Sequence, residues 1–454
     1  MKPIRYFFFV VLLWLMVAGC QTTAPVAESP AETDHRTGVE QMFDESEVFN
    51  QSNTGFVLYD PATGDTLTDR SGHRYFTPAS NMKIFTLYAG LKMLPEAFPG
   101  LRYHVQNDTL YFRGTGDPGF LNPEFEPQPV FDFLSSRTET LVYYDAHFDD
   151  DFFGSGWPWD WHSAAYAPEK TPFPIYGNMM RFQVEQVASI QLDQQNPVKP
   201  AIFEQFITNQ GWNGQQSELI KRELRDNEVL YQPRTDTARQ ERIIPFIYSP
   251  ELITELLADT LGRDVHLATE RIQGFDQAIA GTSVEEALRR MMVESDNFVA
   301  EQTLLAISEQ EFGNMNSARA IAKALDEHFG FLDDRPSWND GSGLTRYNLV
   351  TPWSVITMLD RLWIEYGEEV TLSMFPVGGQ TGTLRGWYQT EEGEPPYVYA
   401  KTGTLRNNTS LSGYIFTDSG RRLLFSFQNN NYVISNNAMR AEMQNLLQFV
   451  KTRY

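Results

Sequence analysis

Three short segments of the chain contain residues whose types and spacing could carry out serine acyl transfer. They are Ser80-Asn81-Met82-Lys83, Ser295-Asp296-Asn297 and Lys401-Thr402-Gly403. A serine hydroxyl attacks a carbonyl efficiently only when a nearby base takes its proton. Lys83 follows Ser80 by three residues, so on a helix both side chains lie on one face and the amine can reach the hydroxyl. We therefore predict that Ser80 is the nucleophile and Lys83 its base.

The lysines of the first and third segments are expected to lie in one pocket. An ammonium group cannot act as a base, so the pKa of Lys83 must be lowered by burial and by a second cation, which Lys401 could supply. Residues 380–382 repeat the third segment with Gln in place of Lys, but only a cation can hold a substrate carboxylate by charge. We expect Thr402, Gly403 and Thr404 to bind substrate, with Gly403 allowing close approach of its backbone.

The second segment is chosen by its context, because the pattern Ser-x-Asn also occurs at residues 337–339 and 435–437. The last of these follows Lys401 and breaks the order of the segments, and residues 337–339 lie in a stretch rich in Pro, Gly and Asp. Ser295 instead follows an apolar run with helical spacing. Ser295 and Asn297 are therefore the predicted catalytic residues of this segment.

The elements that must position these residues can be predicted from local patterns. Thr77-Pro78 is a plausible cap and first-turn pair for a helix that begins near Ser80, and Met82, Phe85, Ala89 and Met93 follow at helical spacing. Unpaired backbone N–H groups at a helix start would favour charge on an attacked carbonyl oxygen. We predict further helices over 283–292, 317–328 and 438–450, and strands over 54–59, 66–68, 397–400, 411–416 and 422–427.

Strands at both ends of the chain with helices between them predict an α/β (α+β) domain, in which helices pack on one antiparallel sheet. Residues 99–262 are rich in aromatic and turn residues and separate the first two segments. We therefore expect a catalytic domain formed by residues 46–98 and 263–454, with one or more inserted domains over 99–262. A flexible linker is expected over residues 20–45, which contain few large apolar groups.

The first 20 residues predict export and lipidation. Lys2 and Arg5 precede an apolar run over residues 7–17, which is typical of a signal peptide over residues 1–19. Val17-Ala18-Gly19-Cys20 resembles the bacterial lipobox, in which the cysteine becomes lipidated, although a chance cysteine is the alternative. Gln21 after the cysteine favours the outer membrane. We expect a periplasmic protein of a Gram-negative-type bacterium that contacts the membrane only through this lipid.

Charge and cysteine content restrict the partners further. The formal net charge of the chain is −23, so nucleic acid is not an expected partner. Cys20 is the one cysteine of the sequence, which excludes an intramolecular disulfide.

Taken together, the three segments resemble those of the penicillin-binding protein and serine β-lactamase superfamily, where they line one active site. Residues 294–302, 340–346 and 382–385 narrow the resemblance to the D-alanyl-D-alanine carboxypeptidase/endopeptidase family known as the penicillin-binding protein 4 or S13 type. That family has a long insertion between the first two motifs, and here 295 − 80 = 215 residues separate Ser80 from Ser295. The resemblance implies a serine β-lactamase/DD-peptidase-like fold and covers nearly all of the mature chain.

The same resemblance implies a function and a mechanism. Ser80 would form an acyl-enzyme with peptidoglycan stem peptides that end in D-Ala-D-Ala, releasing the terminal D-Ala, and the same site could cut D-Ala-diaminopimelate cross-links. Backbone N–H groups of Ser80 and Thr404 would form the oxyanion hole, and Ser295 would pass a proton to the leaving amine. β-Lactam antibiotics would acylate Ser80 as inhibitors. The mechanism requires no metal or organic cofactor, and the sequence leaves open whether the protein forms a homodimer.

Two other functions are considered: a β-lactamase or esterase on the same scaffold, and a non-catalytic envelope protein that binds peptidoglycan. Several conspicuous residues receive no catalytic role. His73 is expected at the surface, and Asp149-Asp150-Asp151 is expected to be a solvated turn rather than a cation site. For Trp157, Trp159 and Trp161, packing of the inserted domain is favoured over a platform for sugars. No chemical role is assigned to Asp340.

Overall fold

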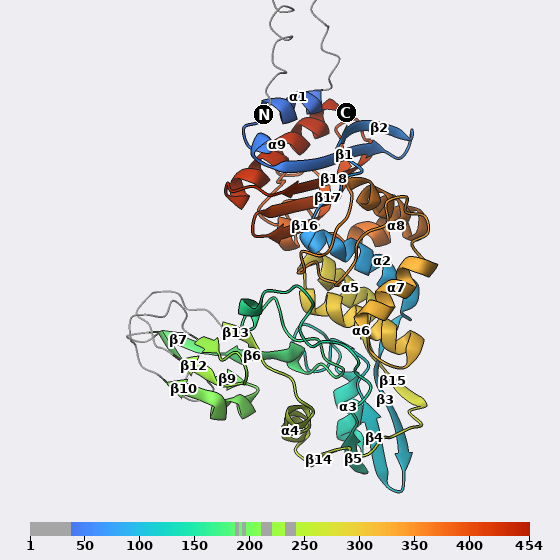
Figure 1. The fold of residues 1–454 in the computed structure, drawn as a ribbon, viewed down its shortest axis with the longest axis vertical. Helices are drawn as coiled ribbons and strands as arrows, with labels where there is room; N and C mark the ends of the chain where they lie inside the picture. Colours follow the sequence, from blue (N-terminus) through green and yellow to red (C-terminus); the bar gives the residue numbers. More distant parts are fainter. Residues whose placement is uncertain (1–37, 187–189, 193–196, 210–219, 232–241) are drawn as a thin grey trace, which may run out of the picture.

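The computed structural model describes residues 38–186, 190–192, 197–209, 220–231 and 242–454. The predicted signal peptide, Cys20 and the first part of the predicted linker lie outside the described residues. Figure 1 shows an elongated molecule, with a sheet and its flanking helices at one end, a helical layer in the middle and the inserted region at the other end. The start of α1 and the C-terminus lie close together at the sheet end.

The main sheet has five strands in the order β16-β17-β18-β1-β2, and every neighbouring pair is antiparallel. Both faces of β1 are buried. Phe56 and Leu58 belong to the apolar core on one face, whereas Val57 belongs to the core on the other. This antiparallel sheet with helices on both faces confirms the predicted fold class. The strands are β1 (Asn53–Asp60), β2 (Asp65–Arg70), β16 (Val398–Leu405), β17 (Asn408–Phe416) and β18 (Arg422–Asn430).

One face of the sheet is covered by the two terminal helices, α1 (Gly38–Glu45) and α9 (Asn436–Arg453). The predicted flexible linker over residues 20–45 is therefore wrong in its last eight residues. Val39 and Phe43 are completely buried in this core. The prediction missed this apolar pair because polar residues dominate the average composition of the segment. Burial of the pair against the sheet stabilises the short helix.

The opposite face is covered by a layer of helices that also extends toward the inserted region (Figure 1). α8 packs directly on β1 and β18, and α2 lies between α8 and the pair α5 and α6. The predicted helices over 283–292 and 317–328 correspond to α5 and α7. The bounds are α2 (Lys83–Met93), α5 (Val284–Val293), α6 (Asn297–Phe312), α7 (Ser317–Glu327) and α8 (Pro352–Ser373).

The start of the nucleophile helix differs from the prediction. Ser80 lies in a 3-10 turn, η2 (Ala79–Met82), and α2 begins only at Lys83. The predicted cap at Thr77-Pro78 is wrong, because Pro78 precedes η2 without a side-chain capping bond. The N–H of Thr77 instead donates to Asn430 Oδ1 at 2.8 Å, which attaches the turn to the end of β18. Contacts with the sheet, rather than a local cap, therefore position this turn.

The inserted region is built on a second five-stranded sheet, in the order β14-β5-β4-β3-β15. Its first strand β3 pairs with its last strand β15, so the chain enters and leaves the region side by side. We therefore propose residues 97 and 283 as the limits of the inserted region, instead of 99 and 262. The pairing of these two strands could not be recognised from composition alone. The elements are β3 (Ala97–Gln106), β4 (Thr109–Arg113), α3 (Pro129–Ser136), β5 (Thr140–Tyr143), α4 (Pro250–Leu261), β14 (Val265–Leu267) and β15 (Gln277–Ser283).

A lobe of short strands projects to one side of this region (Figure 1). It contains a sheet of order β13-β6-β9, a sheet of order β10-β12-β11 and the hairpin β7-β8. No helix among the described residues is both long enough and apolar enough to span a membrane. The strands are β6 (Met179–Phe182), β7 (Val184–Gln186), β8 (Ile190–Leu192), β9 (Val198–Lys199), β10 (Ile207–Asn209), β11 (Ile220–Arg222), β12 (Val229–Tyr231) and β13 (Arg242–Pro245).

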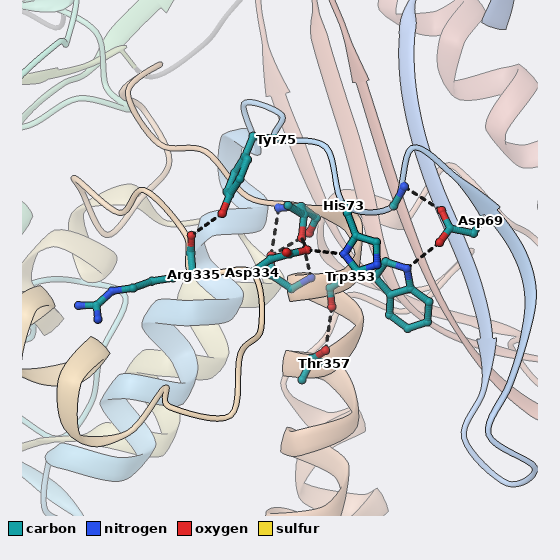
Figure 2. Close-up of polar contacts among 10 residues, drawn as sticks. Asp69, His73, Tyr75, Asp334, Arg335, Trp353 and Thr357 are labelled. Atoms are coloured by element: carbon teal, nitrogen blue, oxygen red, sulfur yellow. Dashed lines mark hydrogen bonds and ion pairs between the residues drawn. The ribbon is translucent and has the colours of Figure 1, made fainter.

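A polar network attaches the loop between β2 and η2 to the start of α8. His73 Nδ1 lies 2.8 Å from Asp334 Oδ2, and the imidazole stacks on Trp353. Figure 2 shows these side chains together. Trp353 Nε1 donates to Asp69 Oδ2 at 2.8 Å, and Tyr75 Oη donates to the carbonyl of Arg335. His73 is largely exposed and takes part in this anchor, which agrees with its expected place at the surface.

Candidate active site

Ser80 and Lys83 are within hydrogen-bonding distance, as their spacing predicts. Lys83 Nζ donates to Ser80 Oγ at 3.0 Å, to Asn297 Oδ1 at 2.5 Å and to the carbonyl of Ser342 at 2.6 Å. Lys83 is completely buried, whereas Ser80 is partly accessible from the cleft. The amine therefore occupies one fixed position beside a hydroxyl that a substrate can reach.

The environment of Lys83 supports its predicted role as a base. Burial lowers its pKa to about 8, although the negative charges of Asp340, Glu301 and Asp296 oppose this shift. A group with this pKa is partly neutral near pH 7 and can accept the proton of Ser80. Burial, one of the two predicted causes, is the principal cause of the shift.

The second and third segments meet at Lys401. Lys401 Nζ donates to Ser295 Oγ at 2.9 Å and to the carbonyl of Thr402 at 3.0 Å. Its pKa is well below the usual value, first because the side chain is buried and second because Lys83 is close. The repulsion between the two lysines thus adds to the effect of burial at Lys401.

Asn297 connects Lys83 with the inserted region. Its Oδ1 accepts from Lys83, and its Nδ2 donates to the carbonyl of Tyr166 at 2.8 Å. Because an amide nitrogen carries two N–H groups, one of them remains for a substrate carbonyl. Ser295 itself has a positive φ of 60°, so the turn before α6 is constrained to direct this side chain toward Lys401.

Gly403 and Gly343 allow their segments of backbone to pack closely against the turn that carries Ser80. A Cβ on Gly403 would lie 2.6 Å from the carbonyl oxygen of Pro78 and 3.0 Å from the backbone nitrogen of Ser80. A Cβ on Gly343 would lie 1.9 Å from the carbonyl oxygen of Ala79. The close approach at Gly403 is therefore with the protein's own turn, whereas the sequence had suggested approach by a substrate backbone.

Two buried carboxyl groups beneath the site received no role from sequence analysis. Asp340 accepts hydrogen bonds from the N–H of Gly343 at 2.8 Å, the N–H of Thr345 at 2.7 Å and Trp157 Nε1 at 2.9 Å. Glu301 Oε1 accepts from the N–H of Ser342 at 2.8 Å, whereas its Oε2 has no partner among the described residues. Burial and then the charge of Asp340 raise the pKa of Glu301 to about 7. Both groups shape the loop whose carbonyl binds Lys83.

A cleft of about 800 Å³ opens above Ser80. Thr402 and Thr404 of β16 line one side, while Trp161 and Tyr166 of the inserted region line another. The three tryptophans have different environments. Trp157 is buried and packs with Ala167 and Leu344, in agreement with the favoured interpretation, whereas Trp159 is 73% exposed. Trp161 is half-buried and lines the cleft.

The alternative motif copies occupy other places. Ser337 lies in an isolated bridge with Leu349, and Ser435 accepts from Ala438 N as the cap of α9. Residues 380–382 lead into a turn from which Thr383 contacts the cleft, with its Oγ1 2.7 Å from Thr402 Oγ1. Among the described residues, no group of three or more His, Cys, Asp or Glu side chains could hold a metal ion.

The predicted Asp149-Asp150-Asp151 turn also has a structural explanation. Asp150 pairs with Lys170 at 3.1 Å and accepts from the N–H of Ser317 at the start of α7. These contacts join the inserted region to the helical layer.

Known proteins resemble this chain in sequence and in fold. A D-alanyl-D-alanine carboxypeptidase from Actinomadura sp. (strain R39) is 24% identical over 473 residues, covering 93% of this chain and 86% of the relative. D-alanyl-D-alanine carboxypeptidase DacB from Haemophilus influenzae is 23% identical over 448 residues, covering 89% of this chain and 90% of the relative. The crystal structure of penicillin-binding protein 4 from the same organism matches the fold with a TM-score of 0.73 at 19% identity, over 92% of this chain and all of that one. The model of the D-Ala-D-Ala carboxypeptidase 3 (S13) family matches residues 36–453, and the chain belongs to this family.

Proposed function

We propose that the protein is a serine DD-peptidase of peptidoglycan that removes the terminal D-Ala of D-Ala-D-Ala stem peptides through an acyl-enzyme on Ser80. One observation carries this proposal: two serines line one cleft, and each hydroxyl is bonded to a buried lysine. Lys83 Nζ is 3.0 Å from Ser80 Oγ, and Lys401 Nζ is 2.9 Å from Ser295 Oγ. One pair can activate the nucleophile while the other delivers a proton to the leaving group.

The chemical steps follow from these positions. Ser80 Oγ attacks the penultimate carbonyl as Lys83 takes its proton, and backbone N–H groups of Ser80 and Thr404 stabilise the oxyanion. Each such donor lowers the barrier by about 3 kcal/mol. Ser295, bonded to Lys401, passes a proton to the amine of the departing D-Ala. Water then attacks the acyl-enzyme and releases the shortened peptide.

The same steps would cut a D-Ala-diaminopimelate cross-link, where the leaving amine belongs to a second stem peptide. The open cleft supports this extension, because its wall from the inserted region is accessible at Tyr166 and Trp161. β-Lactams would enter by the same route and acylate Ser80. A structure of the Haemophilus influenzae relative complexed with a β-lactam supports this proposal by analogy of fold.

The site of action is proposed from the N-terminal sequence. Residues 1–19 have the pattern of a signal peptide, and Cys20 would be lipidated and attach the enzyme to a membrane facing the periplasm. Seventeen residues of sequence lie between Cys20 and the start of α1 at Gly38. Palmitate labelling of the wild type and of Cys20→Ser would test this attachment.

Intact mass spectrometry would test the function most directly. The protein without residues 1–20 is incubated with benzylpenicillin beside Ser80→Ala, and release of D-Ala from a D-Ala-D-Ala peptide is measured in parallel. A lasting adduct and D-Ala release that both require Ser80 are the expected result. Drug hydrolysis without an adduct would indicate a β-lactamase, and an unreacted drug without D-Ala release would indicate a non-catalytic binding protein.

A further inference from the structure

At the end of the cleft where a substrate carboxylate would bind, Lys401 is less favourable as a cation than the sequence suggested. Lys401 is completely buried, and its Nζ donates to Ser295 Oγ and to the carbonyl of Thr402. Its ammonium form is disfavoured by burial and by the neighbouring charge of Lys83. A negatively charged substrate group at Thr402 and Thr404 would therefore gain more from a cation that remains charged.

Arg440 supplies such a cation from an element that no active-site motif includes. It lies in the second turn of α9, lines the cleft together with Ser80, and its Nη2 donates to Thr404 Oγ1 at 3.0 Å. No salt bridge to Arg440 is found within the described part of the chain. A guanidinium stays protonated at any working pH and presents paired N–H donors that match a carboxylate.

The contact also prepares Thr404 for an anion. Because the Thr404 hydroxyl accepts from Arg440, its own O–H is free to donate toward the cleft. Asn436, in the first turn of α9, lines the same cleft, so the positive end of this helix dipole faces the same side. The other cleft arginine with resolved contacts is differently engaged, since Arg346 donates to Asn408 Oδ1 and to the carbonyl of Arg406.

We propose that Arg440, acting with Thr404, recognises the free C-terminal α-carboxylate of the substrate and selects peptides that end in this group. This inference rests on the proposed DD-peptidase function. In this assignment, Arg440 on the last helix binds the C-terminal carboxylate of the peptide. Lys401 supplies the proton that Ser295 passes to the leaving amine.

A matched pair of peptides tests the assignment: diacetyl-Lys-D-Ala-D-Ala and the same peptide with a C-terminal amide. We expect the wild type to prefer the free carboxylate. In Arg440→Gln, kcat/KM for the carboxylate peptide should fall about 10- to 100-fold, while kcat/KM for the amide should change less than about 3-fold, as expected for loss of a bond to a charged group. Arg440→Lys should restore part of the preference.

Arg406→Gln is the control, because Arg406 lines the same cleft, whereas the hydrogen bond to Thr404 Oγ1 found among the described residues comes from Arg440. Its discrimination between the two peptides should remain like that of the wild type. Equal losses on both peptides in Arg440→Gln, or an unchanged preference, would overturn the assignment. A wild type that cleaves neither peptide and forms no Ser80 adduct with benzylpenicillin would overturn the proposed function itself. If the wild type is active and Arg440→Gln still prefers the carboxylate peptide, the role of Arg440 is refuted while the proposed DD-peptidase function stands.

Discussion

The two sides of the cleft differ in how their side chains are held. On the side formed by η2, α6 and β16, Lys83 and Lys401 are completely buried and make several short hydrogen bonds. On the side formed by the inserted region, Tyr166 of the cleft wall is 48% exposed, and Trp159, between the cleft-lining residues Pro158 and Asp160, is 73% exposed. Acyl transfer requires fixed distances, whereas binding of a large polymer requires accessible surface. The comparison teaches that the groups for acyl transfer are fixed on the buried side, while the inserted region offers accessible surface beside them.

The largest expected effect on the buried side comes from Ser295. Ser295→Ala should lower the rate of D-Ala release about 10²- to 10⁴-fold, because the proton path from Lys401 to the leaving amine is lost. Stopped-flow or discontinuous D-Ala assays would measure the change. Ser337→Ala is the matched control, since Ser337 has the same motif pattern at an exposed position. Similar losses in both variants would remove the reason for assigning the proton path to Ser295.

A smaller effect is expected at Asp340, which joins the two sides through its bond with Trp157. Asp340→Ala leaves four backbone or side-chain donors without their acceptor, so the free energy of unfolding should fall by about 3 kcal/mol. Urea denaturation would measure this loss. Asp333→Ala, at an exposed neighbouring position, should change it by less than about 0.5 kcal/mol. If Asp340→Ala lowered the free energy of unfolding as little as Asp333→Ala does, the bond between Asp340 and Trp157 would not stabilise the contact between the two sides.

The pH dependence of acylation would test the electrostatics of the buried side. Only neutral Lys83 can accept a proton, so the rate of benzylpenicillin acylation should rise about tenfold per pH unit below the pKa of about 8 and level off above it. Ionised Glu301 raises this pKa. Glu301→Gln should therefore move the acid limb to lower pH, while the amide can still accept from Ser342 N.

Asp340 and Asp296 also act on Lys83, so the shift in Glu301→Gln should be partial. Glu311→Gln, at an exposed site on α6, should leave the profile in place. A profile of Glu301→Gln that moved to higher pH would contradict the sign of the interaction.

The smallest effect on stability is expected at Trp159, on the exposed side. Trp159→Ala should change the free energy of unfolding by less than about 0.5 kcal/mol, because the side chain buries little surface. Trp157→Ala should lower it by about 3 to 5 kcal/mol through a cavity in the core. If Trp159 contacts glycan, KM for cross-linked muropeptides should rise a few-fold in Trp159→Ala, with benzylpenicillin acylation unchanged. The same KM for both proteins would leave the exposed tryptophan without a binding role.

Much of the fold was predictable because local patterns agree with long-range packing. The strands of the sheet alternate between two buried faces, and α5, α7 and α9 have regular apolar spacing with Ser or Asn caps. The true start of α2 was not predictable, because η2 depends on bonds to β16 and β18. The helix α1 was missed because two buried apolar residues in a polar stretch give a weak signal.

The candidate site divides in the same way. Motif spacing correctly indicated that Ser80 and Lys83 would be close, and motif order suggested the meeting of Ser295 with Lys401. Asp340 and Glu301 were within recognised segments, but their roles depend on burial, which spacing does not reveal. Arg440 carried no motif at all. The one available signal was a basic residue near the start of a helix that follows the last strand.

The attachment of the nucleophile turn to the last strands also governs when activity can arise. Asn81 Nδ2 donates to the carbonyl of Lys401 across 320 residues of sequence, and Ser410 Oγ donates to the carbonyl of Pro78 across 332. Such distant contacts form late, after the loops between them have closed. A nascent chain that still lacks its C-terminal hairpin therefore contains the serine but no assembled active site, and premature cutting of substrate during synthesis is excluded by topology alone.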